Sequence, residues 1–405
     1  MDRDSPIDVM VRNIDELLTM QGGLGVIHDA AVGFVDGKVA FVGPSANAPK
    51  ARRVLYGRGC VGLPGLVDCH THTLFAGSRA QEFEARLAGA DYSAILEAGG
   101  GILSTVRATR AATDEELRAS LRARLVGMFS RGVTTVEVKT GYALSTEQEL
   151  RCLKLMKEAQ PVRVLRTFLG AHTVPQEWRP DQEGYVQHLL DEMLPACAEH
   201  AEMIDVYCDR GAFTLDQTRR ILTAGMALGL KGRVHAEQVE FTGAAALAAE
   251  LGCLSADHLE RLDSAGVRAM AAAGTVAVLL PGAMTYLDDP SPPVGALRDA
   301  GVPMAIATDF NPGTSPVRDL WTAATLACVR LRLSVEETLL GITRHAALAV
   351  GRPDLGHLSE GATGDLVLMR TPAGEPAHHA SLVQFMGGHV ASLVIRDGSV
   401  LLQRA

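Results

Sequence analysis

The sequence predicts an α/β protein built on a (β/α)8 TIM barrel, and three observations support this fold. Eight short apolar runs alternate with helical segments rich in Ala, Leu, Arg and Glu, as expected for repeated βα units. Aromatic residues make up only 4% of the 405 residues, so the core packs small side chains, which suits helices laid on a parallel sheet. Several runs end at reactive polar residues, as barrel strands do. A doubly wound sheet is the alternative, since short runs can be miscounted.

The eight predicted strands follow one another through the middle of the chain. They are Leu66–Cys69, Val133–Val138, Val162–Phe168, Met203–Tyr207, Arg233–Ala236, Leu254–Ala256, Thr275–Leu280 and Pro303–Ala307. Between the first two lies a long excursion, in which Thr113 and Glu116 predict a capped helix start. The glycine cluster at Gly99-Gly100-Gly101 matches no phosphate-binding pattern, and we interpret it as a flexible active-site loop or a plain connector.

Both ends of the chain differ from this middle. Over residues 9–63, short alternating segments are broken by glycine, and Asp36-Gly37 between two of them predicts a β-hairpin. From about Leu355 the pattern returns, with Asp365–Leu368 and Leu393–Val400 as further strands. Both ends are therefore predicted to be β-hairpin material flanking the barrel.

Composition and charge exclude several function classes. The formal net charge of -9, with no Lys/Arg-rich run, argues against a nucleic-acid binder. Met1-Asp2-Arg3-Asp4 is no secretory n-region and no run reaches the ~20 apolar residues of a membrane helix, so we expect a cytoplasmic protein without membrane contact. Seven cysteines without a C-x-x-C pair predict neither a disulfide framework nor a cysteine zinc site. The expected partner is a small molecule; the Ala-rich segment Gly243–Leu251 could form a homodimer interface or pack on the barrel.

Histidines gather where the predicted strands end. Because alternate strand residues point to one face, His70 and His72 can present two imidazoles to one metal ion. The other strand-end residues are His172 after the third run, His235 in the fifth, His258 after the sixth and Asp309 after the eighth. A single histidine at a strand end is more often an ordinary polar residue than a metal ligand. Histidines at the ends of several successive strands, followed by an aspartate, predict a metal centre.

Four of these residues form a plausible ligand set. His70, His72, His235 and Asp309 suit Zn²⁺ or iron, as Fe²⁺ or Fe³⁺, with a water completing the shell. A metal-activated water is a nucleophile at neutral pH. Asp309 could accept its proton, and His258 could orient the water or shuttle the proton, so the identity of the general base stays open.

These motifs resemble the amidohydrolase superfamily, metal-dependent hydrolases on a (β/α)8 barrel. The resemblance rests on Pro64-Gly65-Leu66-Val67-Asp68 before His70-x-His72, with His235, His258 and Asp309. It implies a small composite β-sandwich domain from both chain ends, here residues 1–63 and 355–405, around a hydrolase barrel of residues 64–354. Many members hold a second metal on a carboxylated lysine at the end of strand four. The fourth strand here ends Tyr207-Cys208-Asp209, so the comparison implies one metal.

Within the superfamily, longer motifs resemble the imidazolonepropionase family. They are Phe75-Ala76-Gly77-Ser78-Arg79, Gly99-Gly100-Gly101-Ile102, Glu137-Val138-Lys139-Thr140-Gly141-Tyr142, Gly170-Ala171-His172-Thr173-Val174-Pro175, His235-Ala236-Glu237-Gln238 and Thr308-Asp309-Phe310-Asn311-Pro312-Gly313-Thr314. The resemblance implies hydrolysis of the ring amide of 4-imidazolone-5-propanoate to N-formimino-L-glutamate in histidine degradation.

The expected substrate, imidazolone propionate, is an anion. Its candidate binding residues are Arg79, Tyr142, His172, Gln238, Asn311, Gly313 and Thr314. Arg79 can offer a bidentate guanidinium to the propionate, while Tyr142 and His172 offer neutral donors and acceptors to the ring. The turn residues Asn311, Gly313 and Thr314 can reach the carboxylate, although turn chemistry alone would also explain them. Gln238 can hydrogen-bond the ring but cannot act as a base.

Two other functions stay open at this point. A deaminase of a purine, pyrimidine or triazine would use the same centre, but its substrate would need no cation for a carboxylate tail. A metal-free binding or scaffold relative would carry a broken ligand set, whereas the set in this sequence is intact.

Overall fold

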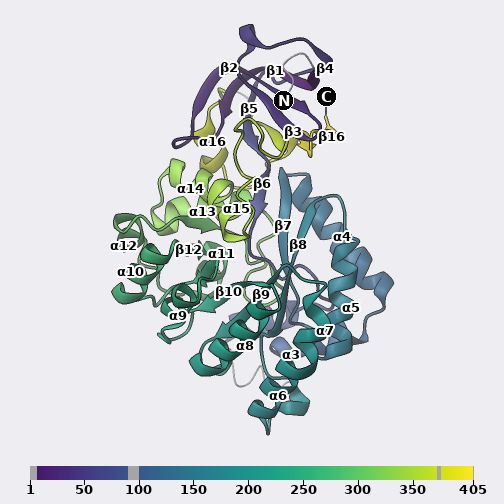
Figure 1. The fold of residues 1–405 in the computed structure, drawn as a ribbon, viewed down its shortest axis with the longest axis vertical. Helices are drawn as coiled ribbons and strands as arrows, with labels where there is room; N and C mark the ends of the chain where they lie inside the picture. Colours follow the sequence, from purple (N-terminus) through teal and green to yellow (C-terminus); the bar gives the residue numbers. More distant parts are fainter. Residues whose placement is uncertain (1–6, 90–99, 372–374, 405) are drawn as a thin grey trace.

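The computed structural model describes residues 7–89, 100–371 and 375–404. They form two β-sheets, and Figure 1 shows the first and last strands of the chain together at one end of the molecule, beyond the helices and strands of the middle. The glycine cluster at Gly99-Gly100-Gly101 is described only in part, because Gly99 lies outside the described residues. Gly101 is described, and its positive φ of 76° precedes a helix, which a glycine adopts without steric cost.

The middle of the chain forms the predicted barrel. Its strands are β6 (Leu66–Asp68), β7 (Val133–Lys139), β8 (Arg163–Ala171), β9 (Met203–Cys208), β10 (Lys231–Ala236), β11 (Ser255–His258), β12 (Val276–Leu279) and β13 (Met304–Ile306). They pair in parallel in chain order. A bridge between Thr71 and Phe310 joins the two ends of the sheet, where the His72 amide donates to the Phe310 carbonyl over 3.0 Å. The predicted fold class is confirmed.

Helices surround these strands and bury small apolar side chains. They are α1 (Ala80–Leu87), α3 (Ile102–Ala111), α4 (Asp114–Phe129), α5 (Thr146–Lys157), α6 (Gln182–His188), α7 (Leu194–Ala198), α8 (Leu215–Ala227), α9 (Ala244–Leu251), α10 (Ser264–Ala273), α11 (Pro281–Leu287), α12 (Val294–Asp299), α13 (Leu320–Leu331), α14 (Val335–Gly341) and α15 (Arg344–Ala349). Helix α4 begins at the capping box of Thr113 and Glu116, as predicted. Helix α9 buries Ala244, Ala245 and Ala248 in the barrel core. Within the described parts of the chain, no helix combines the length and apolarity needed to cross a membrane.

The two chain ends build one mixed sheet. Its strands are β1 (Ile7–Leu18), β2 (Val26–Val35), β3 (Lys38–Pro44), β4 (Ala51–Tyr56), β5 (Cys60–Pro64), β14 (Leu366–Arg370), β15 (Ala391–Arg396) and β16 (Ser399–Gln403). Strand β14 pairs antiparallel with β5, and β2 and β3 form the predicted hairpin at Asp36-Gly37, where both φ angles are positive. The sheet has a hydrophobic core of its own that includes Ile14, Phe34 and Leu366. A composite domain from both chain ends is confirmed, and its boundaries at residues 63 and 355 stay a prediction.

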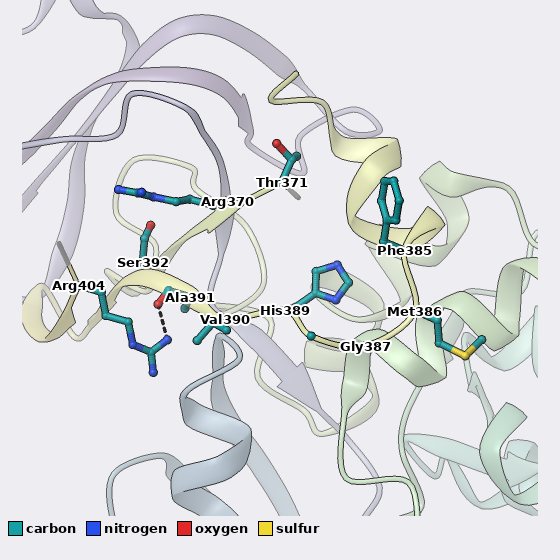
Figure 2. Close-up of a pocket in the computed structure, with 11 residues that line it drawn as sticks. Arg370, Thr371, Phe385, Met386, Gly387, His389, Val390, Ala391, Ser392 and Arg404 are labelled. Atoms are coloured by element: carbon teal, nitrogen blue, oxygen red, sulfur yellow. Dashed lines mark hydrogen bonds between the residues drawn. The ribbon is translucent and has the colours of Figure 1, made fainter. Parts of the chain in front are cut away.

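Helix α16 (His379–Gln384) lies at the junction between this sheet and the barrel. The loop after it borders a surface hollow, shown in Figure 2, in which Arg404 donates a 2.9 Å hydrogen bond to the Ala391 carbonyl. The Ala391 amide in turn donates to the carbonyl of Ser130, three residues before β7. The hollow therefore lies at the amino ends of the barrel strands, opposite the end where barrels place their chemistry.

Candidate metal centre and active site

The carboxyl ends of the barrel strands bring the predicted ligands together. His70 and His72 follow β6, His235 lies in β10, and one ligand atom of each falls within 4.8 Å of the other two. Asp309, three residues after β13, places Oδ1 at 3.4 Å from His70 Nε2 and 3.5 Å from His72 Nε2. All four side chains are buried. Three nitrogens and one carboxylate oxygen thus converge on one point inside the barrel mouth.

The atoms at this point fit a divalent metal ion. His70 Nε2 is buried without a hydrogen-bond partner among the described residues, an arrangement that is costly unless another ligand is bound. Burial holds the pKa of both His70 and His72 well below its ordinary value, so their neutral nitrogens have lone pairs to donate. Imidazole nitrogen and carboxylate oxygen are ligands of Zn²⁺ and Fe²⁺, and the donor set therefore suits either ion.

Two buried carboxylates orient these imidazoles from below. Asp257 Oδ2 lies 2.6 Å from His70 Nδ1, and Asp205 Oδ1 lies 3.0 Å from His235 Nδ1. Each carboxylate holds a proton on Nδ1 and so directs the lone pair of Nε2 into the centre. Sequence reasoning missed both residues. A signal was present in the sequence. Residues two apart on a strand share a face, so Asp205 lies on the same face of β9 as Tyr207, and Asp257 on the same face of β11 as Ser255.

A network of buried charges lies beneath the centre. Lys139 Nζ is 2.9 Å from Glu137 Oε1 and 2.7 Å from Asp205 Oδ2, and Arg233 Nη2 is 2.7 Å from Asp257 Oδ2. All five side chains are fully buried. Burial alone would raise the pKa of Asp205, but His235 and Lys139 hold it well below its ordinary value. The pair of Glu137 and Lys139 belongs to this network beneath the predicted metal ligands.

Asp257→Asn is expected to weaken metal binding by about 10- to 100-fold, the usual cost of losing a carboxylate that orients a metal-bound histidine. Asparagine keeps the shape of the side chain but removes the charge that faces His70 Nδ1. The dissociation constant of the metal, measured by competition with a chelator, checks this. An unchanged constant in a folded variant would show that Asp257 does not orient His70.

His258 lies beside the four ligands. Its ring centroid is 5.4 Å from that of His235 and 5.7 Å from that of His70, and its φ of 81° is left-handed, a strained conformation typical of functional sites. Its Nδ1 is 3.9 Å from Glu260 Oε2, and burial raises the pKa of Glu260 well above its ordinary value. Glu260 is a residue that sequence reasoning missed, since nothing but its place two residues after His258 marked it.

Aromatic rings line one side of the centre. The His172 ring stacks on that of His72 with centroids 4.9 Å apart, and the Tyr142 ring is 5.3 Å from His172. His172 Nδ1 lies 3.0 Å from the Gly141 carbonyl, so it carries the proton and leaves Nε2 as an acceptor. Burial, with the nearby His235, lowers the pKa of His172 to about 3. Both predicted residues therefore present neutral polar groups at the centre.

Gln238 and its neighbour Glu237 have different roles. The Tyr207 hydroxyl donates to Gln238 Oε1 over 3.1 Å, which leaves the amide nitrogen of Gln238 able to donate at the rim. The Glu237 carboxylate accepts from the Ala245 amide at 3.2 Å in the first turn of α9. Glu237 therefore supports the start of α9, and Gln238 is the one of the two that can reach the centre.

The predicted carboxylate-binding residues meet at the rim. A Cβ on Gly313 would lie 2.1 Å from Arg79 Nη1, so glycine lets the guanidinium approach this turn. Arg79 Nη2 also pairs with Glu82 at 2.7 Å. Asn311 Oδ1 accepts from the amides of Gly313 at 2.8 Å and Thr314 at 2.7 Å. The Asn311 side chain therefore shapes the turn, and its direct contact with substrate stays a prediction.

Comparisons with known proteins agree with this geometry. A family model described as "Amidohydrolase family" matches residues 88–401. The imidazolonepropionase of Cupriavidus pinatubonensis is 46% identical over 92% of this chain and 90% of its own length, and that of Caulobacter vibrioides is 48% identical over 85% and 88%. The crystal structure of an adenosine deaminase from Xanthomonas campestris with bound zinc covers 99% of this chain and 94% of its own, with a TM-score of 0.72 and 19% identity, a likeness of fold.

The sequence resemblance, the barrel with its composite sheet and the buried histidines lead to one assignment. The chain belongs to the amidohydrolase family, among its imidazolonepropionases.

Proposed function

We propose that this enzyme hydrolyses the ring amide of 4-imidazolone-5-propanoate to N-formimino-L-glutamate, with one divalent ion, Zn²⁺ or iron, held by His70, His72, His235 and Asp309. The observation that carries the proposal is the convergence of these four donors in a barrel mouth with Arg79 at its rim. Its test is steady-state turnover of freshly generated imidazolone propionate with metal quantified in the same sample. Absence of turnover by metal-loaded enzyme would contradict it.

The residues divide the work of an amide hydrolysis between them. A bound ion would supply a Lewis acid that polarises the ring carbonyl and acidifies a water molecule. Asp309, which faces His70 and His72, is placed to take the proton from that water and return it to the leaving ring nitrogen. His258, next to His235, is the second group able to carry that proton.

The rim would hold the substrate in register with these groups. Tyr142 keeps its hydroxyl proton because burial raises its pKa, and it can donate to the imidazolone ring. His172, neutral and with a free Nε2, can accept from a ring N–H. The Arg79 guanidinium, exchanging Glu82 for the propionate, would form a bidentate ion pair at the turn of Gly313 and Thr314.

Arg79→Met is expected to raise KM for imidazolone propionate by about 10- to 100-fold with a smaller change in kcat, since a hydrogen bond to a charged group contributes about 1.5–3 kcal/mol. Gly313→Ala should shift KM in the same direction, because its Cβ displaces the guanidinium. Arg118→Met, which breaks an exposed pair with Glu158, is the control. An unaffected KM in Arg79→Met would favour the alternative, deamination of an uncharged purine, pyrimidine or triazine.

Two further expectations accompany this function. All seven cysteines are free and six of them are buried, which supports the proposal of a reducing, cytoplasmic location. A homodimer stays a prediction.

A further inference from the structure

We propose that a second transition-metal ion of the Zn²⁺ class binds outside the barrel, where Glu16 of β1 meets His378 and His379 at the start of α16. One ligand atom of each of these residues lies within 4.8 Å of the other two. The cluster joins the first strand of the chain to a helix more than three hundred positions later. It is separate from the centre formed by His70, His72 and His235.

Glu16 is an unusual residue to find at this place. Its side chain is only 2% exposed, on a strand whose Leu18 shares a hydrophobic core with Leu382 and Val383 of α16. A buried carboxylate is costly unless it is paired or binds a metal. Its Oε1 accepts from the His379 amide at 2.7 Å and lies 2.8 Å from His379 Nδ1. Among the described residues these hydrogen bonds both fall on Oε1, so Oε2 remains available as a ligand.

The imidazoles stand next to this carboxylate and open to solvent. The rings of His378 and His379 stack with centroids 4.4 Å apart, and His378 is exposed, so an ion can enter from that side. In the pairing of β1 with β2, His28 lies directly opposite Glu16. Directly opposed residues have Cβ atoms about 5 Å apart, but in this cluster the ligand atoms that lie within 4.8 Å of one another belong, among the described residues, to Glu16, His378 and His379 alone.

The chemistry of these groups selects the kind of ion. Two imidazoles and one carboxylate offer nitrogen and oxygen donors, the set preferred by Zn²⁺ and unsuited to Ca²⁺ or Mg²⁺. The alternative is that Glu16 only caps α16 and orients His379. A bound ion would also link β1 to α16, and it would stabilise the folded chain in proportion to its occupancy.

The test is calorimetric titration of Zn²⁺ into the holoenzyme, after its barrel centre has been filled and one equivalent of metal verified. One additional equivalent is expected to bind, and the melting temperature should rise with it. Replacement of the exposed His378 (His378→Ala) and the isosteric substitution Glu16→Gln should each weaken Zn²⁺ binding at the second site by at least about tenfold. His200→Ala, at the end of α7 and remote in sequence from the cluster, is the matched control and should bind as the unaltered enzyme does.

Two results would overturn the proposal. One is the absence of a second equivalent at Zn²⁺ concentrations up to about 1 mM. Only a site with a dissociation constant above about 1 mM would escape detection. The other is second-site binding that His378→Ala and Glu16→Gln both leave intact, which would place the ion elsewhere.

Discussion

His235→Ala is expected to lose metal and activity together, with metal content falling well below one equivalent and kcat falling by at least about 10³-fold, on the order of 4 kcal/mol of activation free energy. His235 supplies a donor from β10, on the opposite wall of the barrel from His70 and His72. Without it, the remaining donors all come from β6 and β13, which are neighbours. They cannot enclose an ion from both sides.

The measurement pairs elemental analysis with turnover of imidazolone propionate on the same sample. His200→Ala serves as the control for loss of a half-buried histidine outside the centre. Added metal in excess should restore only part of the activity, because affinity as well as geometry is impaired. A variant that retained both its metal and its hydrolysis would rule out His235 as a ligand and with it the proposed centre.

Lys139→Met is expected to destabilise the fold by about 3–5 kcal/mol, the usual cost of removing one partner from a buried ion pair. Lys139 Nζ lies between Glu137 at 2.9 Å and Asp205 at 2.7 Å, and no part of the three side chains is exposed. Methionine of similar volume fills the space but leaves Asp205 Oδ2 without its ion-pair partner, and Glu137 keeps only Arg233, whose Nη1 lies 3.5 Å from Glu137 Oε1. The penalty comes from uncompensated charge, since packing is nearly preserved.

The free energy of unfolding from denaturant titration checks this expectation. Arg219→Met, which breaks an exposed pair with Glu250, should leave the transition midpoint unchanged. Adding Asp205→Asn to Lys139→Met should recover part of the loss, because the carboxylate that lost its ion-pair partner disappears. If Lys139→Met unfolded at the same midpoint as the unaltered enzyme, the buried network would not be a stabilising unit.

The sequence predicted the barrel and the convergence of its candidate metal ligands for a local reason. In a (β/α)8 barrel the order of the strands follows the chain, so residues that end successive runs must meet at one mouth. His70, His72, His235 and Asp309 could be placed together on this ground alone. The same argument brought His172 and His258 to the mouth, where their rings lie next to those of His72 and His235.

What the sequence could not provide depends on side-chain partners. Asp205 and Asp257 resemble ordinary strand residues until the closed barrel brings their carboxylates to His235 Nδ1 and His70 Nδ1. The amide of Asn311 becomes a turn organiser only once the backbone folds around it. The sequence did not indicate that Arg79 pairs with Glu82. A pair of residues three apart at the start of a helix is one of several that the Arg79 side chain could form.

The place of β14 in the composite sheet determines the order in which the chain can fold during synthesis. Residues 366–370 pair with residues 60–64, so the outer edge of β5 has no partner until the whole barrel has been made. An unpaired strand edge invites pairing with other chains. This edge of β5 can therefore be paired by its native partner only after residues 366–370 have been synthesised, so it stays open to other chains for most of translation.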